Sequence, residues 1–300
     1  MLFPRLEDDR LLTSQGRFVV NLALPGMLHA AVLRSPHAHA GLSRVETTAA
    51  RAMPGVEAVY TCADIEAAGV RPLGFLAIVP AVDGGPMSAP PRHAPARDRV
   101  RYVGKPVALV VARSRHQALD AAEAIEVDYS PLDSVSGVER AAAEPRNVVG
   151  LYEYGDRAAL DEAMKAAAHV VSLRIVNNRI APSAMEPRAC VAEPDTATGR
   201  LTLHASSQTP HMTRKLLAAA LALPEAAVRL LVRDIGGGFG SKTALYPEDV
   251  LAAFAARALG RPVAWFADRS EAFLSDAHGR DHVSVCDLAL DAGVLAPALN

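Results

Sequence analysis

Cysteine is scarce in this sequence, which has three in 300 residues, at Cys62, Cys190 and Cys286. The number is odd and the spacing is wide, so the pattern indicates neither a disulfide framework nor an iron-sulfur site. A chain without such a framework is typical of a reducing compartment, and we therefore expect a cytoplasmic protein.

The sequence also has no long hydrophobic run and no large excess of positive or negative charge. No uninterrupted apolar run reaches the length that a bilayer span requires. The first ten residues already carry Arg5, Glu7, Asp8, Asp9 and Arg10, which excludes the apolar core of a signal peptide, so we expect a soluble chain. The net charge is −2 and the basic residues are dispersed, which argues against binding of nucleic acid.

Apolar residues, at 50% of the chain, are abundant enough for the core of one large or two ordinary domains. Residues 1–18 are polar and irregular, and we expect them to form an arm. After them, strand-like runs and helix signals alternate. We expect strands at residues 27–33, 56–61, 106–112 and 125–129, helices at 47–53 and 114–124, and a loop at the proline- and glycine-rich stretch 70–96. This alternation predicts an α/β fold.

Residues 130–150 lack periodicity, and we interpret them as a connection between domains. Beyond it we expect a helix at residues 156–168, a strand at 170–176, a hairpin of 190–193 with 201–205, a helix at 209–222, a strand at 228–235 and a helix at 250–259. Residues 288–300 begin like a further strand. His37 and His39 lie two apart without a third ligand nearby, so we expect a packed or hydrogen-bonded role for them and not metal binding.

The most unusual stretch is RDIGGGFGSK at residues 233–242, between an apolar run and a helical run. Glycine alone takes φ > 0 freely, so the cluster permits a backbone path that other residues resist. A P-loop is a poor fit because Ser241 replaces its second glycine, and because Pro247 starts the next helix too late to place Lys242 on its first turn. A dinucleotide-binding GxGxxG pattern also fails at Ser241.

A second loop is expected beside this one. Gln208 follows the run 201–205 and precedes Thr209 and Pro210, a plausible N-cap and first helical residue. If the strands at 201–205 and 228–235 are parallel, as a crossover helix requires, both loops leave the sheet at the same edge. One pocket could then use both loops.

Six further segments, together with the glycine loop, resemble the molybdenum hydroxylases (xanthine oxidase, aldehyde oxidase and the large subunit of aerobic carbon monoxide dehydrogenase). They match in order: RLED at 5–8, RSPHA at 34–38, YVGKPV at 102–107, MEPR at 185–188, QTPH at 208–211 and DRSE at 268–271. The resemblance covers nearly the whole chain. It implies mixed α/β sheets in a hammerhead domain at residues 19–132, a linker at 133–150 and the first part of a molybdopterin-binding domain at 151–300, after the arm at 1–18.

The same resemblance implies that Gln208, Gly237, Gly238, Phe239 and Gly240 bind the cofactor. The family uses this glutamine to donate a hydrogen bond to a molybdenum oxo group, and a carboxamide is a neutral donor that does not compete for the metal. Phe239 is either a core aromatic or, as the resemblance implies, a residue whose backbone amide lies near the metal's oxygen ligand. If Gly238 has φ > 0, a β-branched residue there should harm folding and molybdenum content.

Charged residues near these loops are interpreted as structural, because alternating charges near loops usually pair. They are Glu186, Arg188, Asp268, Arg269 and Glu271. Two roles for Lys242 stay open, binding of a phosphate or capping of the loop. Purine-oxidising relatives carry a glutamate directly after this lysine, whereas this chain has Thr243, which disfavours a purine substrate.

The resemblance further implies an enzyme that oxidises an aldehyde, an N-heterocycle or a carbon monoxide-type substrate with water as the oxygen source. It implies molybdopterin in the cytosine dinucleotide form with molybdenum, and partner subunits that carry iron-sulfur clusters and FAD. The family's large subunit is more than twice as long, so we expect the general-base glutamate and the remaining cofactor ligands outside these 300 residues, and no cofactor retention by them alone. The alternative is a non-catalytic truncated fragment or the scaffold half of a split large subunit.

Overall fold

The computed structural model describes residues 5–75, 78–81 and 83–293, and the backbone of residues 298 and 299. The chain forms two compact units. The first comprises residues 1–76, 91–134 and 182–277, and the second comprises residues 77–90, 135–181 and 278–300. Contacts within the first unit thus join segments far apart in the sequence.

A seven-stranded mixed sheet organises the first unit, in the order β10-β9-β8-β11-β1-β5-β3. Its strands are β1 (Leu28–Arg34), β3 (Val56–Tyr60), β5 (Pro106–Ala112), β8 (Ala189–Pro194), β9 (Leu201–Ala205), β10 (Val228–Leu231) and β11 (Val263–Phe266). β1 pairs in parallel with β11, with Leu28 opposite Val263. Strands from before residue 135 and after residue 181 therefore share one sheet.

Apolar residues from before residue 135 and from after residue 181 pack against this sheet. All seven residues of β5 are buried, as an uninterrupted apolar run predicts. Alanines of α4 (Arg115–Glu123) pack with β5 in one cluster, and the Ser114 side chain caps α4 by accepting a hydrogen bond from Gln117 N at 3.3 Å. A larger cluster contains Trp265 and apolar residues of α7 (Pro210–Ala220) and α8 (Pro247–Leu259).

The rest of the first unit consists of a small sheet and short helices. β2 (Ala40–Glu46) pairs with β4 (Arg99–Val100) and β6 (Glu126–Pro131). The short helices are α1 (Asp8–Leu12), α2 (Thr48–Arg51), α3 (Cys62–Ala67), α9 (Arg269–Ser275) and the 3-10 turns η1 (Val19–Asn21) and η3 (Glu225–Ala227).

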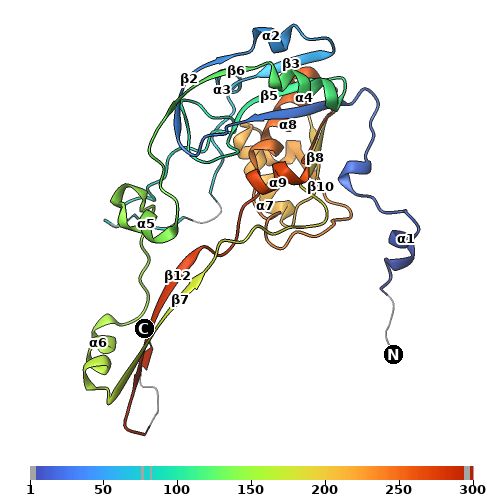
Figure 1. Ribbon diagram of the computed structural model, residues 1–300. Coiled ribbons are helices and arrows are strands. Elements are labelled where there is room, and N and C mark those ends of the chain that lie inside the picture. Colours follow the sequence, from blue (N-terminus) through green and yellow to red (C-terminus); the bar gives the residue numbers. More distant parts are fainter. Residues whose placement is uncertain (1–4, 76–77, 82, 294–297, 300) are drawn as a thin grey trace. The chain divides into compact units, whose positions relative to one another are not determined.

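The second unit contains a long antiparallel ribbon, β7 (His169–Asn177) paired with β12 (His282–Leu290) over nine residue pairs (Figure 1). β13 (Ala298–Leu299) pairs with β12 on its other side. The helices of this unit are α5 (Val138–Ala143), α6 (Arg157–Ala166) and the 3-10 turn η2 (Pro145–Asn147). Eight of the nine residues of β7 are exposed, so this unit buries few of its apolar side chains.

A buried ion network joins Arg34 at the end of β1, Arg188 directly before β8, and Glu248 of α8. Glu248, on the first turn of α8, accepts hydrogen bonds from Arg34 at 2.6 Å and from Arg188 at 2.9 Å. Arg34 also contacts Glu271, and Arg188 contacts Asp276. Burial alone would raise the pKa of Glu248, but the two guanidinium groups outweigh it and hold that pKa at about 2.

Most expected elements are confirmed within a few residues. The hairpin of β8 and β9, the parallel pairing of β9 and β10, and the helices at α4, α6, α7 and α8 are all present. The expected loop at residues 70–96 is irregular where the structure describes it, apart from an isolated bridge between Leu73 and Arg92.

Two expectations are wrong, those for residues 8–12 and for the strand at 228–235. Residues 8–12 are helical and not irregular, because Asp8 and Asp9 occupy the first turn and Arg10 is held by both oxygens of Asp234, at 2.5 and 2.7 Å. The stretch 130–150, which we interpreted as a connection between domains, contains the short helix α5. The strand expected at 228–235 ends at Leu231, since Asp234 binds Arg10 and the backbone N–H of Arg17 instead of extending the ladder.

Other expectations are settled by contacts. The ring centroids of His37 and Tyr129 lie 4.8 Å apart, and Nδ1 of His39 lies 2.7 Å from the carbonyl oxygen of Asp133, which confirms packed and hydrogen-bonded roles. All three cysteines are free thiols. We expected a strand to begin at residue 288, and this region contains the end of β12 and the short strand β13. Residues 294–297 and 300 lie outside the described residues.

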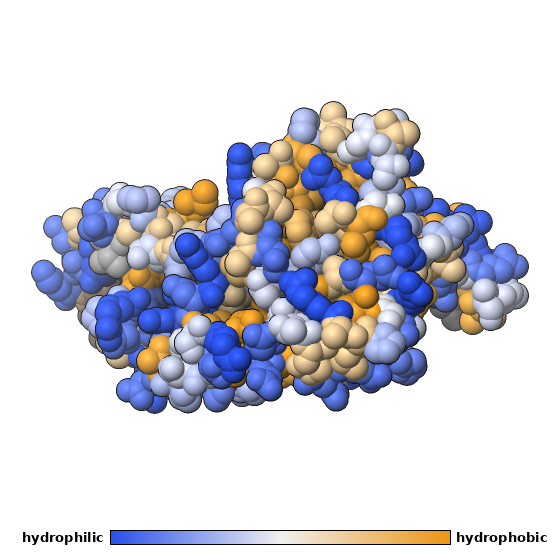
Figure 2. All heavy atoms as spheres, turned by 90° about the horizontal axis from the view of Figure 1, so that it is seen from above, coloured by the Kyte–Doolittle hydropathy of each residue, from blue (hydrophilic) through white to orange (hydrophobic). Residues whose placement is uncertain are grey.

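The surface mixes polar and apolar residues. Figure 2 shows hydrophilic residues spread over the face in view, with apolar residues in small groups between them. Among the helices of the described residues, none has the length and apolar character needed to cross a bilayer.

Candidate functional site

Two loops leave the seven-stranded sheet at the carboxyl ends of β9 and β10. These strands are parallel neighbours, with Leu203 opposite Leu230. Gln208 lies in the first loop, before α7, and residues 233–242, here called the glycine loop, lie in the second. The expectation that both loops emerge at the same edge is therefore confirmed, and this edge is where α/β sheets bind ligands.

Gln208 is hydrogen-bonded directly to the glycine loop. Its side-chain oxygen Oε1 accepts from the backbone N–H of Gly240 at 3.0 Å and of Lys242 at 3.2 Å. The backbone N–H of Gln208 donates to the carbonyl of Lys242 at 2.8 Å. Two N–H donors on one oxygen decide the orientation of the carboxamide. The donor group Nε2 consequently points away from these bonds, and it has no protein partner among the residues that the structure describes.

The backbone of the glycine loop turns through positive φ at three positions. Gly237 has φ +94°, Phe239 +50° and Gly240 +92°. Gly238 does not have positive φ, so the reason we expected for glycine there is wrong. The physical reason is close approach, because a Cβ on Gly238 would lie 2.5 Å from Cδ of Gln208. A non-glycine residue such as Phe239 at positive φ is strained, and such strain clusters at functional sites.

Three consecutive backbone N–H groups of this loop lack an intramolecular acceptor within the described part of the chain, those of Gly237, Gly238 and Phe239. Alternating φ signs turn successive N–H groups to one side, and such a concavity binds anionic oxygen. The Phe239 side chain is 76% exposed, so the core interpretation of this residue is wrong. The loop therefore offers donors and an exposed aromatic ring.

A buried ion pair between Lys242 and Glu186 supports the glycine loop. Lys242 is 1% exposed, and its Nζ lies 2.8 Å from Oε2 of Glu186. The same oxygen accepts the N–H of Gly236 at 2.9 Å. A Cβ on Gly236 would lie 2.6 Å from Cβ of Glu186, so glycine is required for this approach. The open question about Lys242 is thereby settled in this structure: its charge is used inside the protein, and a phosphate-binding role is excluded by its burial.

The second half of the loop is tied to α8. Ser241 is buried, its Oγ donates to the carbonyl of Gly238 at 2.8 Å, and its carbonyl accepts a hydrogen bond from the Tyr246 hydroxyl. The Arg188 guanidinium stacks 3.6 Å from the centroid of the Tyr246 ring and also reaches Glu248. The buried ion network thus continues into the support of the glycine loop.

The remaining charged residues singled out from the sequence are structural, as expected. Asp268 caps α9 by accepting the N–H of Glu271 at 2.7 Å, and Arg269 donates to the carbonyl of Ala184 at 2.5 Å. Burial raises the pKa of Glu271 in spite of its contact with Arg34. None of these groups is placed for proton transfer at the glycine loop in the described structure.

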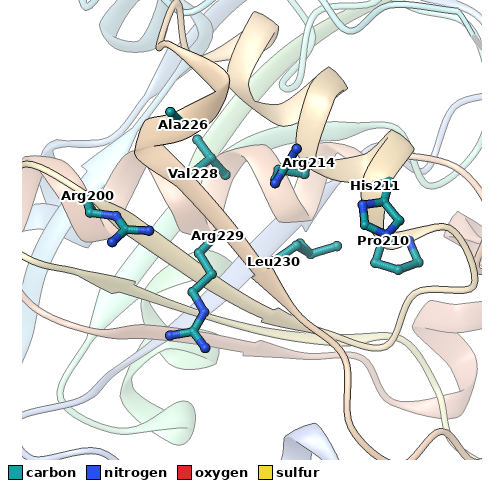
Figure 3. Close-up of a pocket in the computed structure, with 8 residues that line it drawn as sticks. All are labelled: Arg200, Pro210, His211, Arg214, Ala226, Val228, Arg229 and Leu230. Atoms are coloured by element: carbon teal, nitrogen blue, oxygen red, sulfur yellow. The ribbon is translucent and has the colours of Figure 1, made fainter.

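A basic surface pocket was missed by sequence reasoning. It lies between the start of α7 and β10, and its lining residues are Arg200, Pro210, His211, Arg214, Ala226, Val228, Arg229 and Leu230 (Figure 3). Glu225 offsets the charge of Arg214. The parallel pairing of β9 and β10 places Arg229 opposite Thr202, two residues from Arg200, and the register of that pairing cannot be derived from the crossover helix. Neither Gln208 nor the glycine loop lines this pocket.

The family model of the molybdopterin cofactor-binding domain matches residues 141–294. The chain belongs to this family. Residues 13–133 match the a/b hammerhead domain of aldehyde oxidase and xanthine dehydrogenase, which agrees with the fold class expected from the sequence. The resemblance and the mixed α/β architecture are therefore confirmed.

Members of known activity are similar over almost all of this chain. The nicotine 6-hydroxylase large subunit of Paenarthrobacter nicotinovorans is 38% identical over 96% of this chain. The crystal structure of quinoline 2-oxidoreductase from Pseudomonas putida 86 is 35% identical with a TM-score of 0.85 over 99% of this chain. Reconstituted CO dehydrogenase from Oligotropha carboxidovorans is 31% identical with a TM-score of 0.86 over 99% of this chain. The chain spans 36%, 38% and 38% of their respective lengths.

Proposed function

We propose that this chain belongs to the molybdopterin-binding large subunit of an oxidoreductase that hydroxylates an N-heterocyclic substrate with oxygen from water. Membership in the cofactor-binding family supports the cofactor. Two of the three similar proteins described above act, by name, on nicotine and quinoline, and these two have the higher identities. Thr243 in place of a glutamate disfavours a purine.

The observation that carries this proposal is the set of donors at the edge of the sheet. Three backbone N–H groups, from Gly237, Gly238 and Phe239, lie together with the Nε2 group of Gln208 on loops that contact each other. All four are neutral donors held by the protein before any ligand arrives. Such groups stabilise negative charge on an oxygen without competing as metal ligands. These residues therefore fit the oxygen ligands of a molybdenum centre.

When bound, the molybdenum cofactor would supply the two-electron oxidation of a carbon atom. In this chain, Gln208 and residues 237–240 would orient the cofactor, and the Glu186–Lys242 pair would keep the loop in place. The exposed Phe239 ring would offer an apolar face to a planar aromatic substrate. We assign no catalytic acid or base to these 300 residues.

The finer parts of the proposal follow the resemblance. The cofactor is the cytosine dinucleotide form of molybdopterin, and electrons leave to an iron-sulfur subunit and a flavin subunit in the cytoplasm. The three cysteines are free, and two of them are buried, so they leave no iron-sulfur ligation to this part of the chain. A non-catalytic scaffold half remains the second candidate, since the chain spans little more than a third of its relatives.

The experiment is purification of the tagged chain from its native cells with the polypeptides that accompany it. Elemental analysis and cofactor extraction should give about one molybdenum and one pterin per chain, together with iron and flavin on copurifying subunits. Molybdenum without iron or flavin would reject the proposed partners and retain the cofactor. Absence of molybdenum from a folded complex would favour the scaffold.

A further inference from the structure

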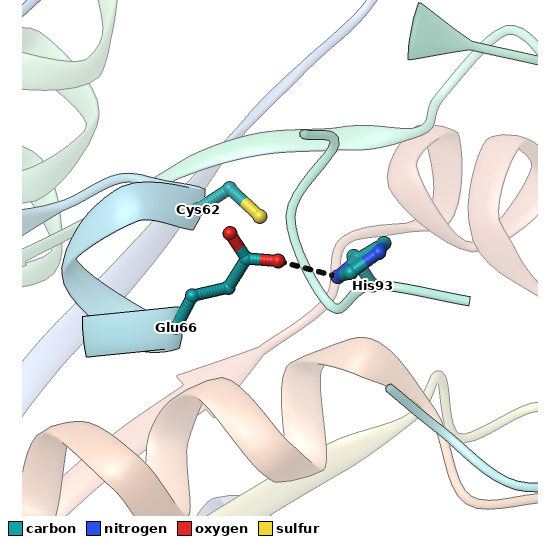
Figure 4. Close-up of side chains that lie close together, drawn as sticks. All are labelled: Cys62, Glu66 and His93. Carbon is teal, nitrogen blue, oxygen red and sulfur yellow. Dashed lines mark ion pairs between the residues drawn. The ribbon is translucent and has the colours of Figure 1, made fainter. Parts of the chain in front are cut away.

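A second group of chemically active side chains lies outside the glycine loop, on α3 and the loop that faces it. Cys62 and Glu66 are one helical turn apart and so project from the same face of α3 (Figure 4). His93 reaches the same point from the facing loop, with Nδ1 3.2 Å from Oε1 of Glu66. The thiol, carboxylate and imidazole ligand atoms all lie within 4.8 Å of one another.

Packing alone does not account for this arrangement. Cys62 is only 6% exposed, yet it belongs to none of the apolar clusters found among the described residues. Its buried surroundings include the ion pair of Glu66 and His93. The thiol, the carboxylate and the imidazole can each offer one ligand atom to a metal ion.

The distances suit a small, borderline-soft cation. Tetrahedral zinc, with bonds of about 2.0–2.3 Å to nitrogen, oxygen and sulfur, holds its ligand atoms roughly 3.3–3.7 Å apart. Oε1 of Glu66 and Nδ1 of His93 are 3.2 Å apart, close to this range. No two of the three ligand atoms are more than 4.8 Å apart, so side-chain rotation has to shorten the longest separation by about one ångström. Glu66 and His93 are partly exposed, so a water or another ligand can reach the fourth position.

Neighbouring groups orient the ligands. Nε of Arg97 lies 3.6 Å from Oε2 of Glu66, which leaves Oε1 turned toward His93. Nζ of Lys105 donates to the carbonyl of His93 at 2.6 Å and fixes the loop that carries the imidazole. Such contacts behind the ligand atoms hold metal-binding side chains in position. The positive charges of Arg97 and Lys105 repel a metal ion. The two anionic ligands, Glu66 and the Cys62 thiolate, offset this repulsion.

We propose that Cys62, Glu66 and His93 form a zinc site with three protein ligands and one exchangeable position, separate from the molybdopterin site. Burial raises the pKa of the Cys62 thiol to about 11, so zinc has to displace its proton. Binding to the folded chain only would also stabilise the fold. The proposal does not depend on the cofactor proposed above.

Cobalt(II) and zinc titrations of the chelator-treated 300-residue chain test the site. We expect one equivalent of cobalt to produce a thiolate-to-metal charge-transfer band in the near ultraviolet, and zinc to displace it. Cys62→Ser should abolish the band, and Glu66→Gln and His93→Ala should weaken cobalt binding by at least about tenfold each. Circular dichroism of each variant checks that it is folded.

Matched controls use residues of the same type elsewhere. Cys286→Ser keeps the two other cysteines, and His116→Ala removes an exposed imidazole of α4, so both should bind cobalt as the parent does. Absence of a charge-transfer band in the parent chain would overturn the proposal. So would a band that survives in folded Cys62→Ser, or one that is lost in Cys286→Ser.

Discussion

Lys242 and Glu186 form a buried ion pair of 2.8 Å beneath the glycine loop. Of the two roles that the sequence left open for Lys242, this contact favours support of the loop over binding of a phosphate. Lys242→Met should destabilise the fold by about 3–5 kcal/mol, because it leaves the Glu186 carboxylate buried without its partner. Urea unfolding measures this cost.

The control for that variant is Lys215→Met, on the exposed side of α7, which should stay within about 0.5 kcal/mol of the parent. The double variant Glu186→Gln with Lys242→Met should recover a large part of the loss, since neither charge remains. If Lys242→Met were as stable as Lys215→Met, the ion pair would not support the loop.

Gly238 and Gln208 should be energetically coupled. Gly238→Ala places a Cβ 2.5 Å from Cδ and Oε1 of Gln208, and we expect it to cost about 1–3 kcal/mol. In the Gln208→Ala background those two atoms are absent, so the same change should cost less by about 1 kcal/mol or more. A double-mutant cycle measured by urea unfolding gives the coupling. Strictly additive effects would show that close approach is not why glycine occupies this position.

Glu248 should make stability depend on pH in the acid range. Its folded-state pKa of about 2 lies below the ordinary value of 4.5, so its stabilisation is complete above about pH 5 and is lost as the pH falls toward 2. The loss of unfolding free energy in Glu248→Gln relative to the parent should therefore be largest near neutral pH, at about 3–5 kcal/mol. Its deficit should shrink at pH 3.5.

Unfolding curves of parent and variant between pH 3.5 and 7 decide this. Glu162→Gln, on the exposed surface of α6, is the matched control and should show a difference near zero throughout. A deficit of Glu248→Gln that is the same at every pH would mean that the carboxylate charge is not what holds Arg34 and Arg188.

One face of β7 should drive self-association of this chain. Val171, Leu173 and Ile175 alternate along the strand, point to one side and are 54%, 57% and 42% exposed. β7 is also an edge strand of its sheet. Exposed apolar residues on a strand edge are a common route to association between copies. Leu173→Lys should lower the oligomer fraction in analytical ultracentrifugation, whereas Ser172→Lys on the opposite side should have less effect. Equal sedimentation of all three proteins as monomers would contradict this.

The paired loops were predictable because the sequence contains local signals for them. Pro210 and Pro247 start helices where expected, and the crossover helix between β9 and β10 requires parallel strands. That geometry brings Gln208 to the glycine loop without any knowledge of tertiary contacts. The positive φ at Phe239 was not predictable, since local preference disfavours it and tertiary contacts impose it.

Other features depend on residues far apart in the chain. β1 joins β11 although Leu28 and Val263 are separated by most of the sequence, and the Arg34–Glu248 contact follows from that pairing. Helix spacing shows Cys62 and Glu66 on one face of α3, but His93 comes from a proline-rich loop whose path has no periodic signal. Contacts of this kind are decided by packing of the whole unit and not by local pattern.

In the function proposed above, the Nε2 group of Gln208 donates to the cofactor while its Oε1 holds the loop. Gln208→Glu separates these roles, because the carboxylate keeps an acceptor for the N–H groups of Gly240 and Lys242 and removes the donor. Turnover per molybdenum in the purified complex is the decisive measurement, with Gln15→Glu at an exposed position as control. We predict a loss of about 100-fold or more for Gln208→Glu, with a melting temperature close to that of the parent. Unchanged turnover per molybdenum in Gln208→Glu would contradict a donor role for Nε2.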